Sequence, residues 1–153
     1  GIIFKDILPI LQKPDEFSEL IKNMSRNKIC KKAEAIISID ARGFIFGTAL
    51  SLITSKPMIV ARKPGKLPGN IISKSYKLEY GENSLSIQKE SLENYNSYLI
   101  VDDLLATGGT VHCVAEIVKE QKKEVTGLSV IVELAELNAK DKLPFPVDSQ
   151  LIL

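Results

Sequence analysis

Residues 98–110 read Tyr-Leu-Ile-Val-Asp-Asp-Leu-Leu-Ala-Thr-Gly-Gly-Thr, and this stretch decides the fold. Its residues 99–101 form a short apolar run, which is typical of a central parallel strand buried on both faces. Asp102 and Asp103 follow at the carboxyl end of that strand, where open α/β sheets bind their ligands. Small side chains at 106–110 let backbone N–H groups surround an anion at the start of the next helix, whose dipole adds to the attraction. The stretch therefore predicts a phosphate-binding loop, with two acids facing whatever is attached to the phosphate.

A simpler interpretation is that the two aspartates and the Gly-Gly pair only shape a turn. The anion site is favoured because both groups flank one strand-to-helix turn, where free N–H groups and the helix dipole act together. Two familiar phosphate motifs are excluded. A Walker loop requires Gly-Lys-Ser/Thr, whereas Gly109 is followed directly by Thr110, and the chain contains no Gly-x-Gly-x-x-Gly. The predicted site is therefore neither a P-loop nor a dinucleotide-binding turn.

Strand and helix patterns alternate along the rest of the chain. Apolar runs predict strands at 35–39, 58–61 and 125–134, and helical spacing predicts helices at 17–24, 43–53 and 111–118. The segment 43–53 is apolar nearly all round, which indicates a buried helix. Residues 62–69 predict a loop, and residues 73–87 predict a hairpin outside the main sheet. This alternation predicts an α/β fold with a central, mostly parallel sheet flanked by helices.

The composition is that of one globular domain spanning residues 1–153, since 44% of the residues are hydrophobic and 25% are charged. Twenty basic and nineteen acidic residues leave a net charge of +1, which argues against a nucleic-acid or membrane surface. Cys30 and Cys113 lie far apart without metal-ligand spacing, so we expect free thiols in a reducing, cytoplasmic setting. No apolar run reaches membrane-spanning length. Because the chain starts at Gly1 rather than Met, we expect that an N-terminal segment is missing.

A second anion site is indicated where the predicted strand at 35–39 ends in Asp40-Ala41-Arg42-Gly43. The turn again lies between a strand and a helix, and Arg42 could add a charged fork to its backbone N–H groups. On local evidence alone it is equally consistent that Asp40 caps the helix and that Arg42 is solvated.

A second basic group, Arg62, Lys63 and Lys66, lies in the predicted loop at 62–69. A charged loop of this kind is usually solvated unless a polyanion lies nearby. A ligand bound at the predicted phosphate loop would be such a polyanion.

Five sequence blocks carry a resemblance to a known family. They are Gly-Ile-Ile-Phe-Lys-Asp-Ile at 1–7, Asp-Ala-Arg-Gly-Phe-Ile-Phe-Gly at 40–47, Arg-Lys-Pro-Gly-Lys-Leu-Pro-Gly at 62–69, Leu-Glu-Tyr-Gly at 78–81, and the acid pair with its loop. The acid pair alone resembles the signature for 5-phosphoribosyl 1-pyrophosphate (PRPP), which type I phosphoribosyltransferases share with some transcription regulators. All five blocks, in this order, resemble the adenine branch of that family. The resemblance implies the type I phosphoribosyltransferase fold, with a small hood and a flexible closing loop.

The resemblance also implies roles for individual residues. Asp102 and Asp103 would engage the ribose hydroxyls of PRPP. The loop for the 5-phosphate would be Ala106, Thr107, Gly108, Gly109 and Thr110. Contacts to the pyrophosphate would come from Arg42, Arg62 and Lys66, and the mobile closing loop would carry Glu79 and Tyr80. The adenine pocket would consist of Ile3, Phe4, Lys5 and Leu104, although Lys5 stands where many relatives have Arg.

The implied activity is transfer of ribose 5-phosphate from PRPP to adenine, giving AMP and pyrophosphate in purine salvage. Glu79 is the expected general base, while Asp102 and Asp103 stabilise positive charge on the ribose. The expected cofactor is Mg2+, held mainly by PRPP and water rather than by protein ligands. A cytoplasmic homodimer is expected, with no nucleic-acid or membrane partner. Two alternatives stay open: a PRPP-binding regulatory protein without catalysis, and a same-fold transferase for hypoxanthine, guanine, xanthine or orotate.

Overall fold

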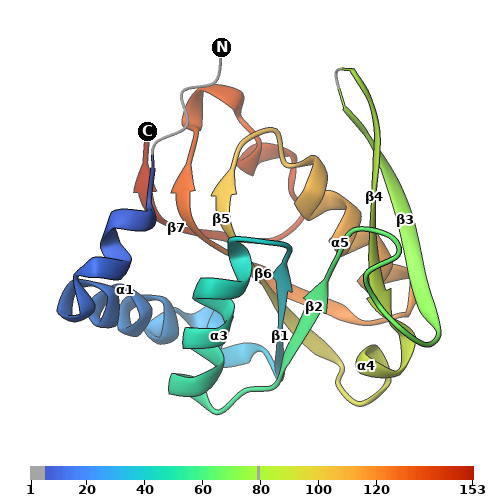
Figure 1. Cartoon of the computed structure of the whole chain (residues 1–153), viewed down its shortest axis with the longest axis horizontal. Coiled ribbons are helices and arrows are strands. Elements are labelled where there is room, and N and C mark those ends of the chain that lie inside the picture. Colours follow the sequence, from blue (N-terminus) through green and yellow to red (C-terminus); the bar gives the residue numbers. More distant parts are fainter. Residues whose placement is uncertain (1–5, 79) are drawn as a thin grey trace.

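The computed structural model describes residues 6–78 and 80–153, and its centre is a sheet of five parallel strands (Figure 1). Across the sheet the strands are β2 (Met58–Ala61), β1 (Ala35–Ile39), β5 (Ser97–Leu105), β6 (Glu124–Glu133) and β7 (Val147–Ile152). From β1 the chain moves outward to β2, and from β5 it moves the opposite way through β6 to β7. The strand order therefore reverses between β1 and β5, and this reversal places a crevice beyond their carboxyl ends.

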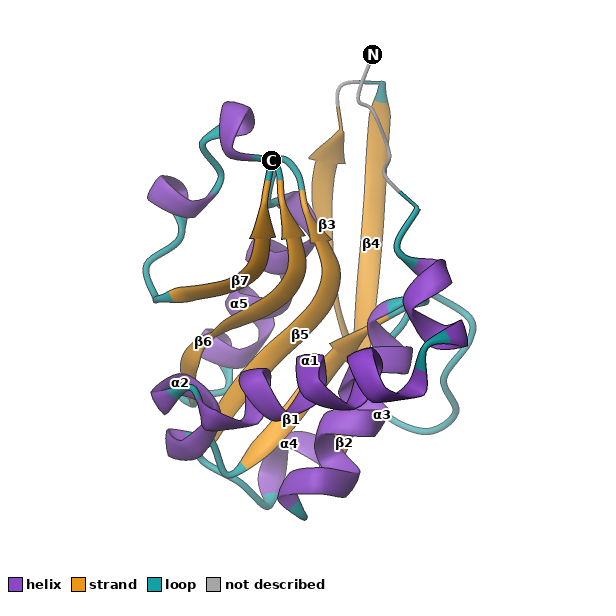
Figure 2. Ribbon diagram, turned by 90° about the vertical axis from the view of Figure 1, so that its left-hand side faces the viewer, coloured by secondary structure: helices purple, strands orange, loops and turns teal. Residues whose placement is uncertain are grey.

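Helices cover both faces of the sheet (Figure 2). Because neighbouring strand residues point to opposite faces, Ile36 and Leu99 pack among helices α1 to α3, whereas Ile37 and Ile100 pack among α5 and the hairpin. The central strands are apolar along most of their length because neither face meets water. The helices are α1 (Pro14–Arg26), α2 (Lys28–Lys32), α3 (Gly43–Thr54), α4 (Lys89–Glu93) and α5 (Gly109–Glu120), with short 3-10 turns at Leu8–Gln12, Ala135–Leu137 and Lys140–Lys142.

An antiparallel hairpin of β3 (Ile71–Leu78) and β4 (Gly81–Gln88) stands outside the main sheet. An isolated antiparallel bridge between Arg62 and Ser86 links its base to the end of β2. Strand β3 packs along α5, and the free end of the hairpin projects past the carboxyl ends of the sheet strands (Figure 1). The hairpin thus lies over the same edge of the sheet as the predicted ligand site.

Most of the predicted elements are confirmed. The strands at 35–39 and 58–61, the hairpin at 73–87 and the α/β architecture all occur as expected. Both cysteines are free and buried. None of the helices in the described part of the chain is long and apolar enough to cross a membrane.

Two predictions need correction, and three elements were missed. Helix α3 is not buried all round, because it packs on the sheet by one side only and leaves the Leu52 side chain 79% exposed. Strand β5 does not end at residue 101, since its pairing with β6 continues to Leu105. Asp102 and Asp103 therefore lie within the strand rather than after it. The short helices α2 and α4 and the edge strand β7 had no prediction.

Candidate active site

The crevice between β1 and β5 exists because the two strands end at different levels. Pairing between them stops at Ser38 and Val101, while β5 continues along β6. Asp102 therefore pairs with Val130 of β6 but with no residue of β1, and this side of β5 opens toward the turn at 40–43. The strand-order reversal brings together two turns that are far apart in the sequence.

A cavity of about 180 Å3 occupies this position. Three segments line it: the start of α3, the end of β5 and the start of α5. The lining residues that were predicted from the sequence are Arg42, Asp102, Asp103, Leu104, Ala106, Thr107, Gly108, Gly109 and Thr110. The structure thus gathers the acid pair, the small-residue loop and one arginine around one hollow.

The small-residue loop has the geometry of an anion site. Gly108 directly precedes α5 with a φ of +86°, a left-handed conformation that favours glycine. No side chain accepts a capping hydrogen bond at this end of α5, so the N–H groups of its first turn can donate to a ligand. These groups and the helix dipole together favour a bound phosphate.

The acid pair is almost fully buried, with 8% of Asp102 and 7% of Asp103 exposed. The backbone N–H of Asp103 donates to Oδ1 of Asp102 over 2.8 Å. Burial raises the pKa of Asp102 well above its ordinary value, and the neighbouring Asp103 carboxyl adds to this rise. Arg42 opposes the rise, and its Nε lies 2.6 Å from Oδ2 of Asp103. Asp103 therefore has a close cation, whereas burial beside Asp103 favours the neutral form of Asp102.

The turn at 40–43 packs directly against the acid pair. A Cβ on Gly43 would lie 3.1 Å from the carbonyl oxygen of Val101 and 3.2 Å from Oδ1 of Asp102. Such separations are tighter than ordinary contacts, so a side chain at Gly43 would push the turn away from β5. Glycine at this position holds the turn close to the acids.

The interpretation that Asp40 caps α3 is wrong. Asp40 Oδ2 accepts a hydrogen bond from Arg62 Nε over 3.1 Å, and no side chain caps the helix. The Arg62 guanidinium also lies 5.8 Å from the centre of the Phe44 ring. Arg42 is likewise paired rather than merely solvated, through Asp103. Sequence analysis missed both ion pairs because their members are distant in the chain.

Three further predicted residues, Arg62, Lys66 and Tyr80, are described by the structure but do not line this cavity. Arg62 lies beside Asp40, Lys66 is on the exposed loop, and the Tyr80 side chain is 93% exposed at the end of the hairpin. Ile3, Phe4, Lys5 and Glu79 lie outside the described residues. These predictions of site membership stay predictions.

One residue that the sequence analysis did not select contacts the loop directly. Tyr76 of β3 places its hydroxyl 3.4 Å from Oγ1 of Thr110. The sequence feature that could have indicated this contact is the two-residue period of a strand, which places Lys74 and Tyr76 on the same face of β3.

Comparison with known proteins agrees with this geometry. A family model described as a phosphoribosyl transferase domain matches residues 5–149. An adenine phosphoribosyltransferase of Prochlorococcus marinus (strain MIT 9211) is 66% identical over 152 residues, which cover 99% of this chain and 88% of that protein. The adenine phosphoribosyltransferase of Mycoplasmopsis synoviae (strain 53) is 43% identical, with coverage of 97% and 88%.

Solved structures show the same similarity. Adenine phosphoribosyltransferase from Thermoanaerobacter pseudethanolicus has a TM-score of 0.93 and 37% identity, covering 100% of this chain and 90% of its own. The Saccharomyces cerevisiae adenine phosphoribosyltransferase, solved with adenine and an imino-altritol bisphosphate, has a TM-score of 0.88 and 33% identity, with coverage of 99% and 88%. The similarity therefore extends over nearly the whole of each chain.

Proposed function

Because this chain belongs to the phosphoribosyltransferase family and, within it, to the adenine phosphoribosyltransferases of purine salvage, we propose that its cavity transfers ribose 5-phosphate from PRPP to adenine. The products are AMP and pyrophosphate. The observation that carries the site assignment is the meeting of a buried acid pair with an uncapped helix start in one cavity. A phosphate at the helix start and a ribose over the acids use both features at once.

The 5-phosphate binds at the start of α5, in the loop formed by Ala106, Thr107, Gly108, Gly109 and Thr110. The small side chains leave the backbone N–H groups accessible, and the two threonine hydroxyls can donate to phosphate oxygens. Since this site recognises only a phosphate, it serves PRPP and AMP alike.

Asp102 and Asp103 accept hydrogen bonds from the ribose hydroxyls and stabilise the transition state. Positive charge develops on the ribose ring as its C1–O bond to pyrophosphate breaks. A carboxylate is worth more against such charge in a buried site than in water, because less solvent screens it. The ribose hydroxyls also supply hydrogen-bond donors that favour the charged form of Asp102.

The pyrophosphate is assigned to the opposite side of the acid pair, where Arg42, Arg62 and Lys66 neutralise its charge. Arg42 already lines the cavity, and its side chain is 45% exposed, so it can accept a second anion beside Asp103. Arg62 is held by Asp40 at the end of β1, and Lys66 follows on the exposed loop.

The donor set of the cavity fits a Mg2+ ion held mainly by the substrate. Mg2+ typically binds through one or two carboxylates, substrate phosphates and water, and the cavity contains two adjacent carboxylates, Asp102 and Asp103. When bound, the ion neutralises charge on the departing pyrophosphate. The protein's own part is to hold the ribose hydroxyls and the 5-phosphate in place.

The adenine pocket and the general base are assigned from the family resemblance. Leu104 lines the cavity, and Ile3, Phe4 and Lys5 complete the assigned pocket. Glu79 is the assigned base for the proton that adenine loses, and Tyr80 accompanies it at the end of the hairpin. Closure of the hairpin end would exclude water and so prevent hydrolysis of PRPP.

The protein is proposed to act as a cytoplasmic homodimer. The exposed apolar side chains of Leu52 and Ile53 on α3 support an association surface, since such groups are more often covered. Light scattering on the purified protein measures the assembly, and a monomeric mass at working concentrations contradicts it.

The activity is tested by pyrophosphate release from PRPP with Mg2+, run in parallel with adenine, hypoxanthine, guanine, xanthine, orotate and no base. We expect release only with adenine, and one AMP for each pyrophosphate. Equal rates with another base would refute the substrate assignment. Absence of turnover with every base, combined with tight PRPP binding, would support a regulatory protein instead.

A further inference from the structure

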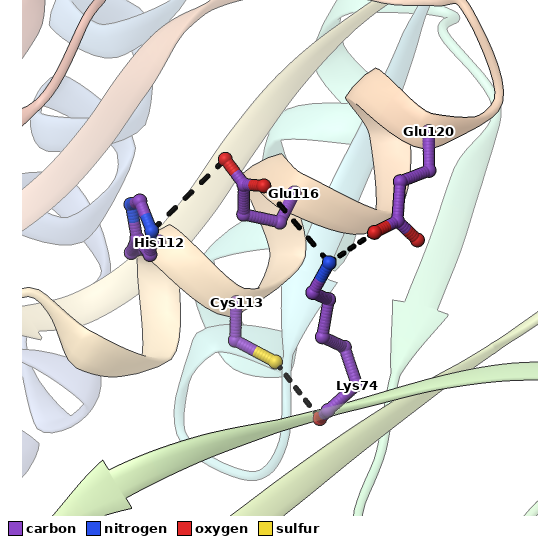
Figure 3. A network of polar contacts seen from close by, with 5 residues as sticks. All are labelled: Lys74, His112, Cys113, Glu116 and Glu120. Carbon is purple, nitrogen blue, oxygen red and sulfur yellow. Dashed lines mark hydrogen bonds and ion pairs between the residues drawn. The ribbon is translucent and has the colours of Figure 1, made fainter.

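The hairpin is fastened to α5 by contacts between Lys74 of β3 and side chains of the helix (Figure 3). The Lys74 ammonium pairs with Glu120, and Glu116 lies 4.0 Å away. The Cys113 thiol lies 3.1 Å from the backbone carbonyl oxygen of Lys74 and donates to it. These contacts hold the middle of β3 on the helix whose first turn belongs to the phosphate loop.

Tyr76 is the next residue on the same face, and it contacts that first turn. Its hydroxyl lies 3.4 Å from Oγ1 of Thr110. A ring atom, Cδ2, lies 3.3 Å from the position that a Cβ on Gly109 would take. Tyr76 therefore packs against two successive residues of the loop, and the neighbouring Ser75 points outward.

The phosphate loop has a cavity on each side. A second cavity, of about 470 Å3, lies between β3, α5 and the turn after β6. Thr107, Gly108 and Gly109 line both this cavity and the smaller one that contains the acid pair. The loop therefore separates the two cavities, and Tyr76 lies on the side away from Asp102 and Asp103.

We propose that Tyr76 is a positioning residue for the 5-phosphate, acting through the hydroxyl of Thr110. The inference rests on the proposed function, which assigns Thr110 to that phosphate. Without ligand, the Thr110 hydroxyl donates to Tyr76. A phosphate only accepts hydrogen bonds, so Thr110 turns its single proton to the phosphate, and the Tyr76 phenol donates to the threonine oxygen in its place.

The separation between the two hydroxyls is long in the unliganded state. An O···O distance of 3.4 Å exceeds the common range for a hydroxyl pair, so the contact is slack. When Thr110 donates to a phosphate, its oxygen becomes a better acceptor, and the bond from Tyr76 strengthens. Tyr76 thereby fixes one donor at the phosphate and couples the hairpin to the occupied loop.

The test uses Tyr76→Phe, which keeps the ring against Gly109 and removes only the hydroxyl. Loss of one neutral hydrogen bond weakens a complex about 2- to 10-fold. We expect this loss for both PRPP and AMP, because both carry the 5-phosphate, and no loss for pyrophosphate. Calorimetric titration of the three ligands with Mg2+ measures the affinities.

The matched control is Ser75→Ala. Ser75 Oγ lies 3.0 Å from Ser84 Oγ on the outward face, so its loss weakens the hairpin without touching the loop. We expect the control to bind all three ligands as the wild type does. In Thr110→Val, adding Tyr76→Phe should cause no further loss, because the relay is already broken.

The outcomes separate the two proposals. If the wild type binds PRPP and AMP and Tyr76→Phe binds them equally well, the positioning role is overturned and the proposed function stands. A loss that is equal for pyrophosphate also overturns it, since it indicates a displaced hairpin. If the wild type binds neither PRPP nor AMP, the proposed function itself fails, and the inference fails with it.

Discussion

Replacing Gly108 tests the phosphate loop through its backbone. The residue has a φ of +86°, and the nearest atoms to a Cβ added there are the Ala139 Cβ at 3.4 Å and the Leu105 Cδ1 at 3.9 Å. These are ordinary contacts, so an alanine has room for its methyl group. The cost of Gly108→Ala therefore lies in the left-handed backbone, about 1–2 kcal/mol.

If the loop of the free variant relaxes to a negative φ to avoid this strain, ligand binding must return it to the positive φ, which costs the same free energy. A cost of about 1–2 kcal/mol corresponds to about 5- to 30-fold weaker binding of PRPP and AMP. Gly108→Val should abolish binding, because a β-branched residue resists a positive φ more strongly and its extra methyls block the anion. Titration calorimetry with PRPP and AMP measures both variants.

Gly69 provides the control, since its φ of +77° imposes similar strain and no atom lies within 4 Å of an added Cβ. Gly69→Ala should lower the urea midpoint of unfolding through similar backbone strain, yet keep AMP affinity, because AMP has no group at the pyrophosphate position assigned to this loop. Near wild-type PRPP binding by a folded Gly108→Val protein would refute the assignment of this loop to the 5-phosphate.

Three further predictions concern charged residues assigned to the substrate site. Asp102→Asn and Asp103→Asn should lower kcat more than they raise KM, because their charge acts mainly on the transition state; steady-state kinetics in which only KM changes would reassign them to ground-state ribose binding. Arg42→Ala and Lys66→Ala should weaken the binding of PRPP and pyrophosphate but not of AMP, and an equal loss for AMP argues against the pyrophosphate assignment. Arg42→Ala should also lower the urea midpoint of unfolding, because it leaves the buried Asp103 without its cation. Burial raises the folded-state pKa of Asp102 above its unfolded value of 3.8. Between these two values the folded protein binds more protons than the unfolded chain, so the contribution of Asp102 to the free energy of unfolding falls as the pH rises. Asp102→Asn should therefore gain stability relative to wild type as the pH is raised from 4 to 7, and urea midpoints that run parallel over this range would contradict the raised pKa.

The parts of the fold predicted from sequence are those with a local signal. The apolar run of β1 and the amphipathic spacing of α5 each depend on neighbouring residues, so they are visible without knowledge of the fold. The loop at 106–110 belongs to the same class, because its small residues are neighbours in the sequence. The edge strand β7 was missed because its six residues alternate weakly and it forms only by pairing with β6.

The exposed side of α3 shows the limit of composition as a guide to burial. Its sequence is apolar nearly all round, yet Leu52 and Ile53 are exposed because only one side of the helix reaches the sheet. Likewise, the true length of β5 depends on β6, whose residues Val132 and Glu133 pair with Leu104 and Leu105. Both properties belong to the packing partner rather than to the segment itself.

The α/β class, the small-residue loop and the acid pair were predictable from neighbouring residues, because hydrophobic period, glycine and helix-start signals act over a few residues. The pairing of polar side chains that are distant in the sequence depended instead on how the elements pack. Arg62 meets Asp40 across 22 residues, Thr110 meets Tyr76 across 34, and Arg42 reaches Asp103 from another strand's turn. Such contacts follow from the order of strands in the sheet and from the place where the hairpin packs. Arg42 and Arg62 therefore form ion pairs that the sequence did not indicate, since a buried carboxylate without a partner destabilises the fold.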